Sequence, residues 1–386
     1  MEPTRMKRKI LYISGTRADY GLMRPVLKKL DISQKIDLEL VITGMHLMGE
    51  FGMTINEIKE DSFKIHEIKV DFPEDNKFSA VNFIGNFIIL LGNAVKTIDP
   101  DIILLLGDRA EMLAGAIVGT YLNIPVAHLH GGEISSTVDE YARHAITKLA
   151  NIHLAATEES AERIKKIGEN PENVFVVGAP GLDNIFEEDL IEPYELSKKY
   201  DLDISEPFIM VVQHPVSLEF ENSADQIIET LEAIVTTGYQ TIIIFPNADA
   251  GGRKIIKTIK NYEKYPFIQT FKSIPNKDYL SLMNMASVLV GNSSSGIIEA
   301  PSLGLPVVNI GSRQDGRERG QNIIDAGYNR SEIKLAIDKA INDSEFKKLV
   351  KKSQNPYGDG NASTRIMEIL SEIQLDQTLL KKQLDI

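Results

Sequence analysis

The chain has 386 residues and no cysteine, with a hydrophobic content of 43% and a charged content of 25%. This composition is typical of a soluble globular protein, and the length predicts two or three domains. The lack of cysteine excludes disulfides, thiolate catalysis and cysteine-ligated metals, and the net charge of −13 argues against non-specific nucleic-acid binding.

The sequence predicts neither a signal peptide nor a membrane-spanning segment. Residues Met1–Lys9 are charged and lead directly into a strand-like run. Apolar runs such as Phe87–Leu91 and Ile102–Leu106 are far shorter than the roughly 20 residues that cross a bilayer. We therefore expect a soluble, cytoplasmic protein with no nucleic-acid or membrane partner.

The first half alternates strand-like and helical segments. Strands are predicted over residues 9–14, 37–43, 63–70, 101–106, 125–129, 152–156 and 174–177, and helices over 22–30, 83–98, 111–122 and 139–150. This order indicates a parallel α/β sheet whose continuous apolar strands are covered on both faces. The segment 83–98 is unusually apolar, which fits either a core helix or the interface of a homo-oligomer.

The same alternation restarts in the second half. Its predicted strands are 208–213, 241–245, 268–271, 287–290 and 307–310, and its predicted helices are 223–236, 255–262 and 297–303. The fold class is therefore α/β, with two doubly wound Rossmann-like domains, 1–185 and 207–360, joined by a linker over 186–206. A final segment, 361–386, carries an amphipathic helix over 365–380 that is expected to act as a structural strap.

The segment Gly291–Glu299 follows an apolar strand and precedes a predicted helix. Its small hydroxyl-bearing residues lie where backbone N–H groups and the helix dipole favour an anion, particularly a phosphate. Glu299 follows one turn later and can accept hydrogen bonds from a ribose. A capped helix after a glycine-rich turn is the alternative.

Polar residues gather at other predicted strand ends, where ligands of open α/β sheets bind. In the first half these residues are Arg17, Asp19, Asp108, Arg109, His130, Glu133 and Asp139. In the second half they are His214, Asn247, Arg253, Ser293, Ser294, Ser295, Glu299 and Arg313. If the two domains face each other, the two sets line one cleft. Acids and bases in one half, with anion donors in the other, suit a nucleotide diphosphate whose attached group meets the acids and bases.

No cofactor or metal is expected from the motifs. The residues His128, His130 and Glu133 could form a metal site, but no supporting motif accompanies them. The phosphate-binding GxxxxGK[ST] motif is absent. The turn Gly178–Gly181 follows a strand without opening a dinucleotide-binding fingerprint, which argues against NAD.

Six motifs in order resemble the hydrolysing UDP-N-acetylglucosamine 2-epimerases of sialic-acid-type sugar pathways. They are Gly15–Gly21, Gly107–Arg109, His130–Glu133, Arg143–Lys148, Gly291–Ser294 and Gly311–Gln314. The resemblance implies the two-domain GT-B fold, with the C-terminal helix crossing back to the first domain. It also implies the reaction UDP-GlcNAc + water → ManNAc + UDP, by elimination of UDP to a 2-acetamidoglucal and hydration with inversion at C2.

The resemblance carries roles to individual residues. The candidate acids and bases are Asp108, Glu133, Asp139, His214 and His130. The candidate substrate-binding residues are Arg17, Asp19, Arg109, His214, Asn247, Arg253, Ser293, Ser294, Glu299 and Arg313. Some relatives carry a carboxylate at the position of His130, so either His130 or Glu133 takes that role, and some have serine in place of Gly21. The expected ligands are a UDP-sugar and UDP, and the expected assembly is a homodimer or homotetramer.

Four alternatives remain at this stage. A non-hydrolysing epimerase shares the fold, but GTRADYG and HLHGGE favour the hydrolysing branch over the GTRPE and HVEAG motifs of the other. A hydrolysing enzyme could act on a 2,4-diacetamido-trideoxy sugar or on a GDP-sugar. A GT-B glycosyltransferase would need an acceptor. A nucleotide-sugar sensor would bind its ligand without turnover.

Overall fold

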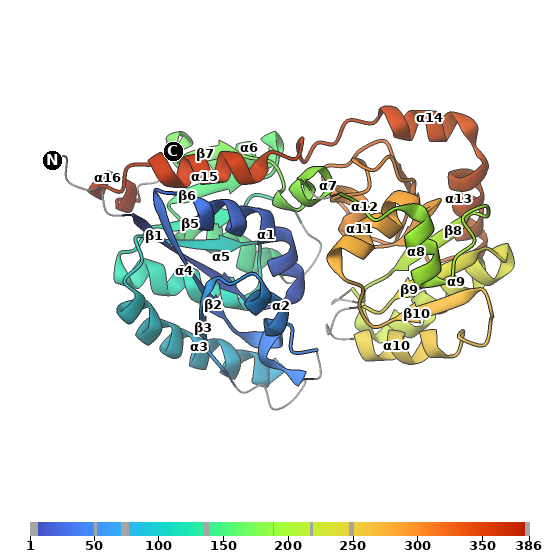
Figure 1. Cartoon of the computed structure of the whole chain (residues 1–386), viewed down its shortest axis with the longest axis horizontal. Coiled ribbons are helices and arrows are strands. Elements are labelled where there is room, and N and C mark those ends of the chain that lie inside the picture. Colours follow the sequence, from blue (N-terminus) through green and yellow to red (C-terminus); the bar gives the residue numbers. More distant parts are fainter. Residues whose placement is uncertain are drawn as a thin grey trace. The chain divides into compact units, whose positions relative to one another are not determined.

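The computed structural model describes residues 7–49, 52–70, 77–134, 139–187, 189–216, 219–246 and 251–382. The chain divides into two compact units (Figure 1). The first unit comprises Met1–Glu133, Asp139–Asp183 and Gly358–Ile386, and the second comprises Ile134–Val138 and Asn184–Tyr357. Each unit is a parallel sheet with helices on both faces, so the predicted pair of Rossmann-like domains is confirmed.

The described part of the first unit contains a seven-stranded parallel sheet in the order β3-β2-β1-β4-β5-β6-β7. Its strands are β1 (Arg8–Ser14), β2 (Ile36–Ile42), β3 (Lys64–Glu67), β4 (Ile102–Leu106), β5 (Val126–Leu129), β6 (Ile152–Ala155) and β7 (Val174–Val176). All five residues of β4 are buried, as expected for a strand covered on both faces. The order in which successive strands are added reverses between β1 and β4, and ligands of such sheets bind at this point.

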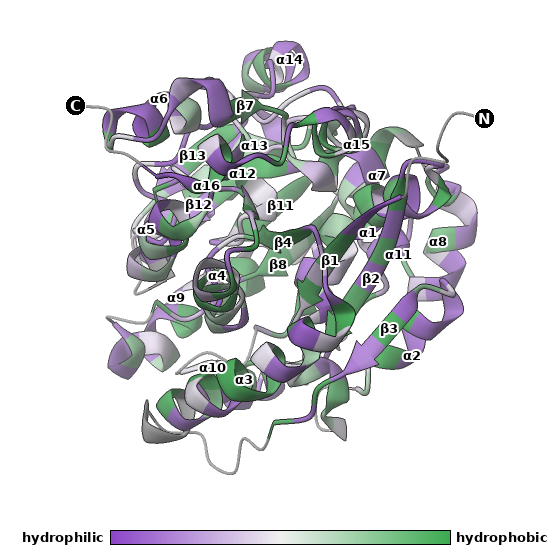
Figure 2. Cartoon of the chain, turned by 90° about the vertical axis from the view of Figure 1, so that its left-hand side faces the viewer, coloured by the Kyte–Doolittle hydropathy of each residue, from purple (hydrophilic) through white to green (hydrophobic). Residues whose placement is uncertain are grey.

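Helices cover both faces of this sheet and form a separate core on each. On one face lie α1 (Arg17–Ile32), α2 (Ile55–Glu60), α15 (Ala362–Glu372) and α16 (Gln377–Leu380). On the other lie α3 (Lys77–Ile98), α4 (Ala110–Leu122) and α5 (Asp139–Leu149). Further elements are α6 (Glu158–Lys166), α7 (Asp183–Glu187), η1 (Gly44–Leu47), η3 (Pro171–Asn173) and η4 (Pro180–Leu182). Figure 2 shows hydrophobic residues in β1, β2 and α3.

The described part of the second unit contains a six-stranded parallel sheet in the order β10-β9-β8-β11-β12-β13. Its strands are β8 (Phe208–Val212), β9 (Gln240–Ile244), β10 (Ile268–Phe271), β11 (Val288–Gly291), β12 (Val307–Ile310) and β13 (Ile323–Ala326). Its helices are α8 (Pro193–Tyr200), η5 (Phe220–Asn222), α9 (Ser223–Thr237), α10 (Gly252–Lys260), α11 (Asn276–Met285), α12 (Ser295–Ile298), α13 (Arg330–Asn342) and α14 (Ser344–Lys352). The order in which successive strands are added reverses between β8 and β11.

The C-terminal segment returns to the first unit, where α15 packs against α1 (Figure 1). The buried Asp183 carboxylate caps α15 by accepting hydrogen bonds from the backbone N–H groups of Ala362, at 3.0 Å, and Ser363, at 2.6 Å. The side chains of Ala362, Ile366 and Leu370 of α15 and of Leu379 of α16 enter the same core as α1. The strap is therefore part of the first unit's core.

Several elements differ from the sequence prediction. Helix α1 begins at Arg17 rather than Leu22, because Thr16 and Asp19 form a capping box. The helix predicted over 297–303 ends at Ile298 and continues as turns. The helix predicted over 365–380 is split into α15 and α16. Strand β13 was not predicted, because IIDA is short and contains an aspartate.

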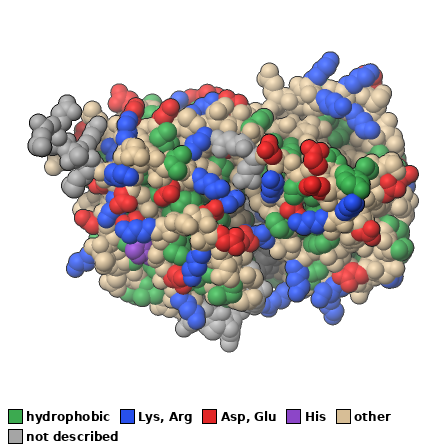
Figure 3. Space-filling view, viewed as in Figure 1, with side chains coloured by type: hydrophobic (Ala, Val, Ile, Leu, Met, Phe, Trp, Pro, Cys, Tyr) green, Lys and Arg blue, Asp and Glu red, His purple; other side chains and the backbone are tan. Residues whose placement is uncertain are grey.

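Charged side chains of both signs are interspersed over the face drawn in Figure 3. No broad single-sign patch of lysine and arginine is visible on that face.

Candidate active site

The loop after β1 is built by Asp19. Its carboxylate accepts hydrogen bonds from the backbone N–H groups of Gly15, at 3.1 Å, and Thr16, at 2.7 Å, and it also contacts the Ser14 hydroxyl. Asp19 is 5% exposed. The structure thus places this predicted substrate-binding residue beneath the loop, where it shapes the backbone that precedes Arg17.

Both arginines at the β1–β4 switch point are held by carboxylates. Arg17 Nη2 lies 3.1 Å from Glu57 Oε1 of α2, and Arg109 Nε lies 3.3 Å from Glu111 Oε2 of α4. Glu111 is 3% exposed and lies directly under Gly15, since a Cβ on this glycine would be 2.6 Å from Glu111 Oε1. A side chain at position 15 would therefore displace the carboxylate that orients Arg109.

The acid and base candidates of the first unit gather around Arg143 of α5. Its guanidinium donates hydrogen bonds to the Asp108 carboxylate and to the His130 carbonyl, the latter at 2.7 Å, and lies 3.9 Å from Glu133 Oε2. His130 Nδ1 lies 2.5 Å from Glu133 Oε1. These groups come from the ends of β4 and β5, which are adjacent strands.

Several of these residues are shielded or strained, as is common at active sites. Arg143 and Glu133 are each 3% exposed, whereas the Asp108 side chain retains 22% of its accessible surface. His130 adopts a left-handed backbone conformation with φ of +59°, which is uncommon for a residue with a side chain. The arrangement presents a carboxylate to solvent beside a buried imidazole–carboxylate pair and a fixed positive charge.

In the second unit, Asn292 connects the ends of β8, β11 and β12. Its side-chain amide makes two hydrogen bonds with the His214 backbone, and its own carbonyl accepts from Arg313 Nη1 at 3.0 Å and Gln314 Nε2 at 2.8 Å. Asn292 is 1% exposed. The Asn292 side chain thus holds His214, and its backbone carbonyl holds Arg313, so one buried residue positions both predicted substrate-binding residues at the switch point of this sheet.

The turn after Asn292 offers uncharged donors. Within the part of the chain that the structure describes, the backbone N–H groups of Ser293 and Ser294 have no hydrogen-bond partner. Tyr279 of α11 lies beside Ser293, Ser295 and Glu299, and burial raises the pKa of its hydroxyl to about 12. Glu299 is 6% exposed. Such a turn can bind an anion through its backbone, although α12 is too short to contribute a large dipole.

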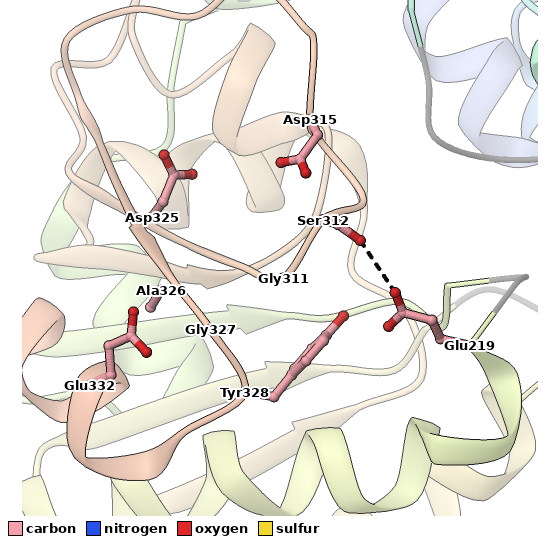
Figure 4. A pocket seen from close by; sticks show the side chains of 9 residues that line it. All are labelled: Glu219, Gly311, Ser312, Asp315, Asp325, Ala326, Gly327, Tyr328 and Glu332. Carbon is pink, nitrogen blue, oxygen red and sulfur yellow. Dashed lines mark hydrogen bonds between the residues drawn. The ribbon is translucent and has the colours of Figure 1, made fainter.

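A pocket of about 400 Å³ opens at the ends of β12 and β13 (Figure 4). Its lining residues are Glu219, Gly311, Ser312, Asp315, Asp325, Ala326, Gly327, Tyr328 and Glu332. Figure 4 shows the Tyr328 hydroxyl directed toward Ser312 and Glu219, whose side chains are hydrogen-bonded at 3.4 Å. The four carboxylates of this lining would repel a diphosphate.

Three predicted residues are not brought into these clusters. Arg253 is exposed near the start of α10. Asn247 lies outside the described residues, and so does the side chain of Asp139, which begins α5.

The sequence is similar to one known protein family and to named relatives. The model of the family UDP-N-acetylglucosamine 2-epimerase matches residues 28–371. The chain belongs to this family. It is 42% identical to the UDP-N,N'-diacetylbacillosamine 2-epimerase (hydrolyzing) of Legionella pneumophila over 98% of this chain and 99% of that one. It is 35% identical to a UDP-N-acetylglucosamine 2-epimerase of Neisseria meningitidis over 88% and 89% of the two chains.

A solved structure supports the fold of this epimerase family member. The UDP-GlcNAc 2-epimerase from Neisseria meningitidis bound to UDP-GlcNAc aligns with a TM-score of 0.81 at 21% identity, covering 94% of this chain and 99% of that one. At this identity the likeness establishes the fold, and the expected GT-B architecture of two Rossmann-like domains is confirmed.

Four residues of this epimerase's candidate site were not selected from the sequence as site residues. They are Arg143, Asn292, Glu111 and Tyr279. Arg143 and Asn292 lie inside two of the motifs that indicated the family, and a buried cation or amide within such a motif is the signal that could have identified them. Glu111 and Tyr279 have no comparable signal, because their importance depends on contacts with Gly15 and with the Ser293 turn.

Proposed function

We propose that this chain is a hydrolysing 2-epimerase of a UDP-linked 2-acetamido sugar, and that it supplies sialic-acid-type sugar biosynthesis. The observation that carries the proposal is the cluster of Asp108, His130 and Glu133 around Arg143 at the ends of β4 and β5. Acids and bases in the first unit and anion donors in the second match the two tasks of the reaction, which are proton transfer at C2 and release of UDP.

The first step is an elimination. A carboxylate, for which Asp108 is the exposed candidate, removes the C2 proton while the C1–O bond breaks. The C2–H electron pair forms the C1=C2 double bond of a 2-acetamidoglucal, and UDP leaves with the C1–O pair. The C2 proton is barely acidic, so a positioned base is required, and such a base contributes roughly 10²–10⁴-fold.

The second step is a hydration. Water loses a proton to a base as its oxygen bonds to C1, and C2 receives a proton on the face opposite the one that lost it. The free sugar is released with inverted configuration at C2. The His130–Glu133 pair is proposed to deliver or accept these protons, because an imidazole and a carboxylate in contact can exchange one.

The leaving diphosphate needs its growing negative charge stabilised. Arg313 and the backbone N–H groups of Ser293 and Ser294 are proposed to do this, with Arg17 contributing from the first unit. Oriented donors of this kind act at the atoms where charge develops and are typically worth about 3 kcal/mol each.

Two substrates are consistent with this chemistry. UDP-GlcNAc, giving ManNAc, is the substrate that the family resemblance implies. A UDP-2,4-diacetamido-trideoxy hexose is the second candidate, because the relative that is 42% identical carries the name of a UDP-N,N'-diacetylbacillosamine 2-epimerase. The two sugars differ at C4 and C6, away from the C1–C2 bond, so the proposed steps are the same for both.

Product analysis by NMR in D₂O tests the proposal. The protein is incubated with UDP-GlcNAc, the diacetamido UDP-sugar or the corresponding GDP-sugar, without an acceptor. We expect equal amounts of UDP and a free C2-inverted sugar carrying deuterium at C2. An intact nucleotide sugar with inverted C2 indicates the non-hydrolysing reaction instead. Turnover only after addition of an acceptor indicates a glycosyltransferase, and binding without turnover indicates a sensor.

A further inference from the structure

His128 is fully buried on β5, and both nitrogens of its ring are engaged. Nε2 lies 2.8 Å from the Gly107 carbonyl oxygen, and Nδ1 lies 3.2 Å from the Thr147 hydroxyl. The sequence suggested His128 as a possible metal ligand together with His130. In the structure, both of its ring nitrogens instead contact protein groups, one after β4 and one on α5. It serves as a bridge between the end of β4 and helix α5.

Each partner of His128 leads directly to the acid–base cluster. Gly107 precedes Asp108 and has a φ of +78°, so the position of its carbonyl fixes the peptide that carries Asp108. Thr147 lies one turn after Arg143 on α5, and its hydroxyl is 2.9 Å from the Arg143 carbonyl oxygen. The His128 imidazole thus contacts the carbonyl of the residue before Asp108 and a side chain of α5, the helix that carries Arg143.

The ring also fits closely beneath the next loop. A Cβ on Gly131 would lie 2.9 Å from His128 Nδ1 and 3.0 Å from Thr147 Oγ1. The backbone of Gly131, which follows His130, therefore packs directly against the side chains of His128 and Thr147. A smaller residue at position 128 would leave the loops after β4 and β5 without their common support.

The imidazole is neutral and has a defined tautomer. Burial lowers the pKa of His128 to about 3. Because a carbonyl oxygen only accepts, Nε2 carries the proton and donates to Gly107, which leaves Nδ1 as an acceptor. The single hydroxyl proton of Thr147 lies between two acceptors, this nitrogen and the Arg143 carbonyl oxygen. A neutral ring sealed beneath the loops can orient other groups but does not itself exchange protons with a substrate.

We propose that His128 is a positioning residue for the epimerase reaction, which holds Asp108 and Arg143 in register by bridging the Gly107 carbonyl and Thr147. This inference rests on the proposed function. It implies a specific kinetic signature, since the groups proposed to bind UDP, apart from Arg17, lie in the second unit. Loss of the bridge should slow the chemical step and leave nucleotide binding nearly unchanged.

The test compares His128→Ala, His128→Gln and Thr147→Val in the full-length protein. The side-chain amide of glutamine can still donate to the Gly107 carbonyl. We expect His128→Ala to lower kcat about 100-fold, the scale expected when a catalytic group moves by about 1 Å, with KM and UDP affinity within about threefold of wild type. His128→Gln should recover at least about tenfold of that loss, and Thr147→Val should give an intermediate kcat.

Leu154→Ala is the matched control for a general loss of stability, because Leu154 is also fully buried and lies on the adjacent strand β6. It should lower the melting temperature with kcat within about threefold of wild type. Equal kcat losses in Leu154→Ala and His128→Ala, or no rescue by His128→Gln, would overturn the inference.

Crystal structures of wild type and His128→Ala, each with UDP, supply a readout that does not need turnover. The inference requires the Asp108 carboxylate to move away from Arg143 in the variant, and an unchanged pair would refute it. If wild type converts none of the nucleotide sugars, the proposed function fails while this structural comparison still decides the role of His128.

Discussion

Asn292 holds the backbone of His214 with both ends of its side-chain amide. Its Oδ1 accepts a hydrogen bond from the His214 N–H at 2.7 Å, and its Nδ2 donates to the His214 carbonyl at 2.9 Å. The two residues are 78 positions apart and lie at the ends of the adjacent strands β8 and β11. The position of the His214 backbone is therefore determined by a residue outside its own loop.

Replacing Asn292 with alanine should impair the proposed nucleotide site. Both hydrogen bonds to His214 are lost, so we expect kcat/KM to fall about 10- to 100-fold and the stability to drop by about 1–3 kcal/mol. Asn309→Ala is the control, because Asn309 is equally buried on β12 but donates to Asp325 at 2.8 Å. Steady-state kinetics and urea unfolding of both variants check this. Equal kinetic losses in the two variants would show that Asn292 acts through stability alone.

Asp108→Asn should separate chemistry from binding. The amide is similar in shape but cannot accept the C2 proton, so we expect kcat to fall at least about 100-fold. UDP affinity, measured by calorimetry, should change less than about threefold. Asp101→Asn is the matched control, since Asp101 precedes β4 at its other end, where its carboxylate accepts from the Lys9 N–H at 2.7 Å. Unchanged turnover in Asp108→Asn would remove Asp108 from the mechanism.

Ser294→Ala tests the anion-binding turn. If its hydroxyl contacts the diphosphate, its loss removes a hydrogen bond to a charged group, and UDP affinity should fall about 10-fold or more. Ser302→Ala is the control, because the Ser302 hydroxyl is 2.7 Å from Asn355 Nδ2 in the turns that follow α12. Calorimetry with UDP measures both affinities. Undiminished binding in Ser294→Ala would place the phosphates elsewhere.

Much of the fold could be predicted from local pattern. Buried parallel strands such as Ile102–Leu106 are continuous apolar runs, and these gave both sheets. The predicted C-terminal helix was wrong in its continuity, because α15 ends at Glu372 and the Asp376 side chain caps a separate helix, α16. Strand β13 was missed because its pairing with β12, and not its composition, makes it a strand.

The sequence predicted only those candidate site residues that lie at the carboxyl ends of predicted strands. That rule located Asp108, Glu133 and Ser293. It could not find the Arg143 contact with Asp108, because 35 positions separate them and Arg143 lies within a helix. The same rule could not show that Asp19 is buried beneath its own loop. An aspartate that caps a helix cannot be told from one that binds a ligand by sequence alone.

Stability at acidic pH should depend on Glu169. This 3% exposed carboxylate contacts His153 Nε2 at 3.0 Å, Lys148 Nζ at 2.5 Å and Lys382 Nζ at 2.7 Å. Burial alone would raise the pKa of Glu169, but the hydrogen bonds from these three groups outweigh it and lower the pKa to about 2. Because the unfolded value is about 4.3, the unfolded state binds the proton first as pH falls.

The Glu169 contribution is therefore complete above about pH 4.3 and is lost as pH falls toward 2. Glu169→Gln should destabilise the protein by about 2–3 kcal/mol at pH 7, and the difference from wild type should shrink between pH 4 and pH 3. Urea unfolding across this range measures it. The control is Glu172→Gln, which alters an exposed carboxylate nearby. A difference that does not depend on pH would contradict the assignment.

The outer face of α3 is expected to form a homo-oligomer interface. Val81 and Ile89 are 64% and 66% exposed, and Gly85 lies between them on the same face with no atom within 4 Å of an added Cβ. The inner face packs in the core through Phe87 and Leu91. By length and composition Val81–Ile98 could also cross a membrane, and 28% of it is buried. An apolar face of this kind requires a partner, and a second copy is the partner we expect.

Ile89→Lys should convert the expected dimer or tetramer into a smaller species, because a lysine would be buried without a partner charge at the interface. Light scattering after size-exclusion chromatography without detergent gives the mass of each species. Ile32→Lys is the matched control, since Ile32 is 75% exposed at the end of α1, on the other face of the sheet, and should leave the mass unchanged. A monomeric wild type would contradict the expected assembly, and wild type that sediments with membranes would assign the apolar face to lipid instead.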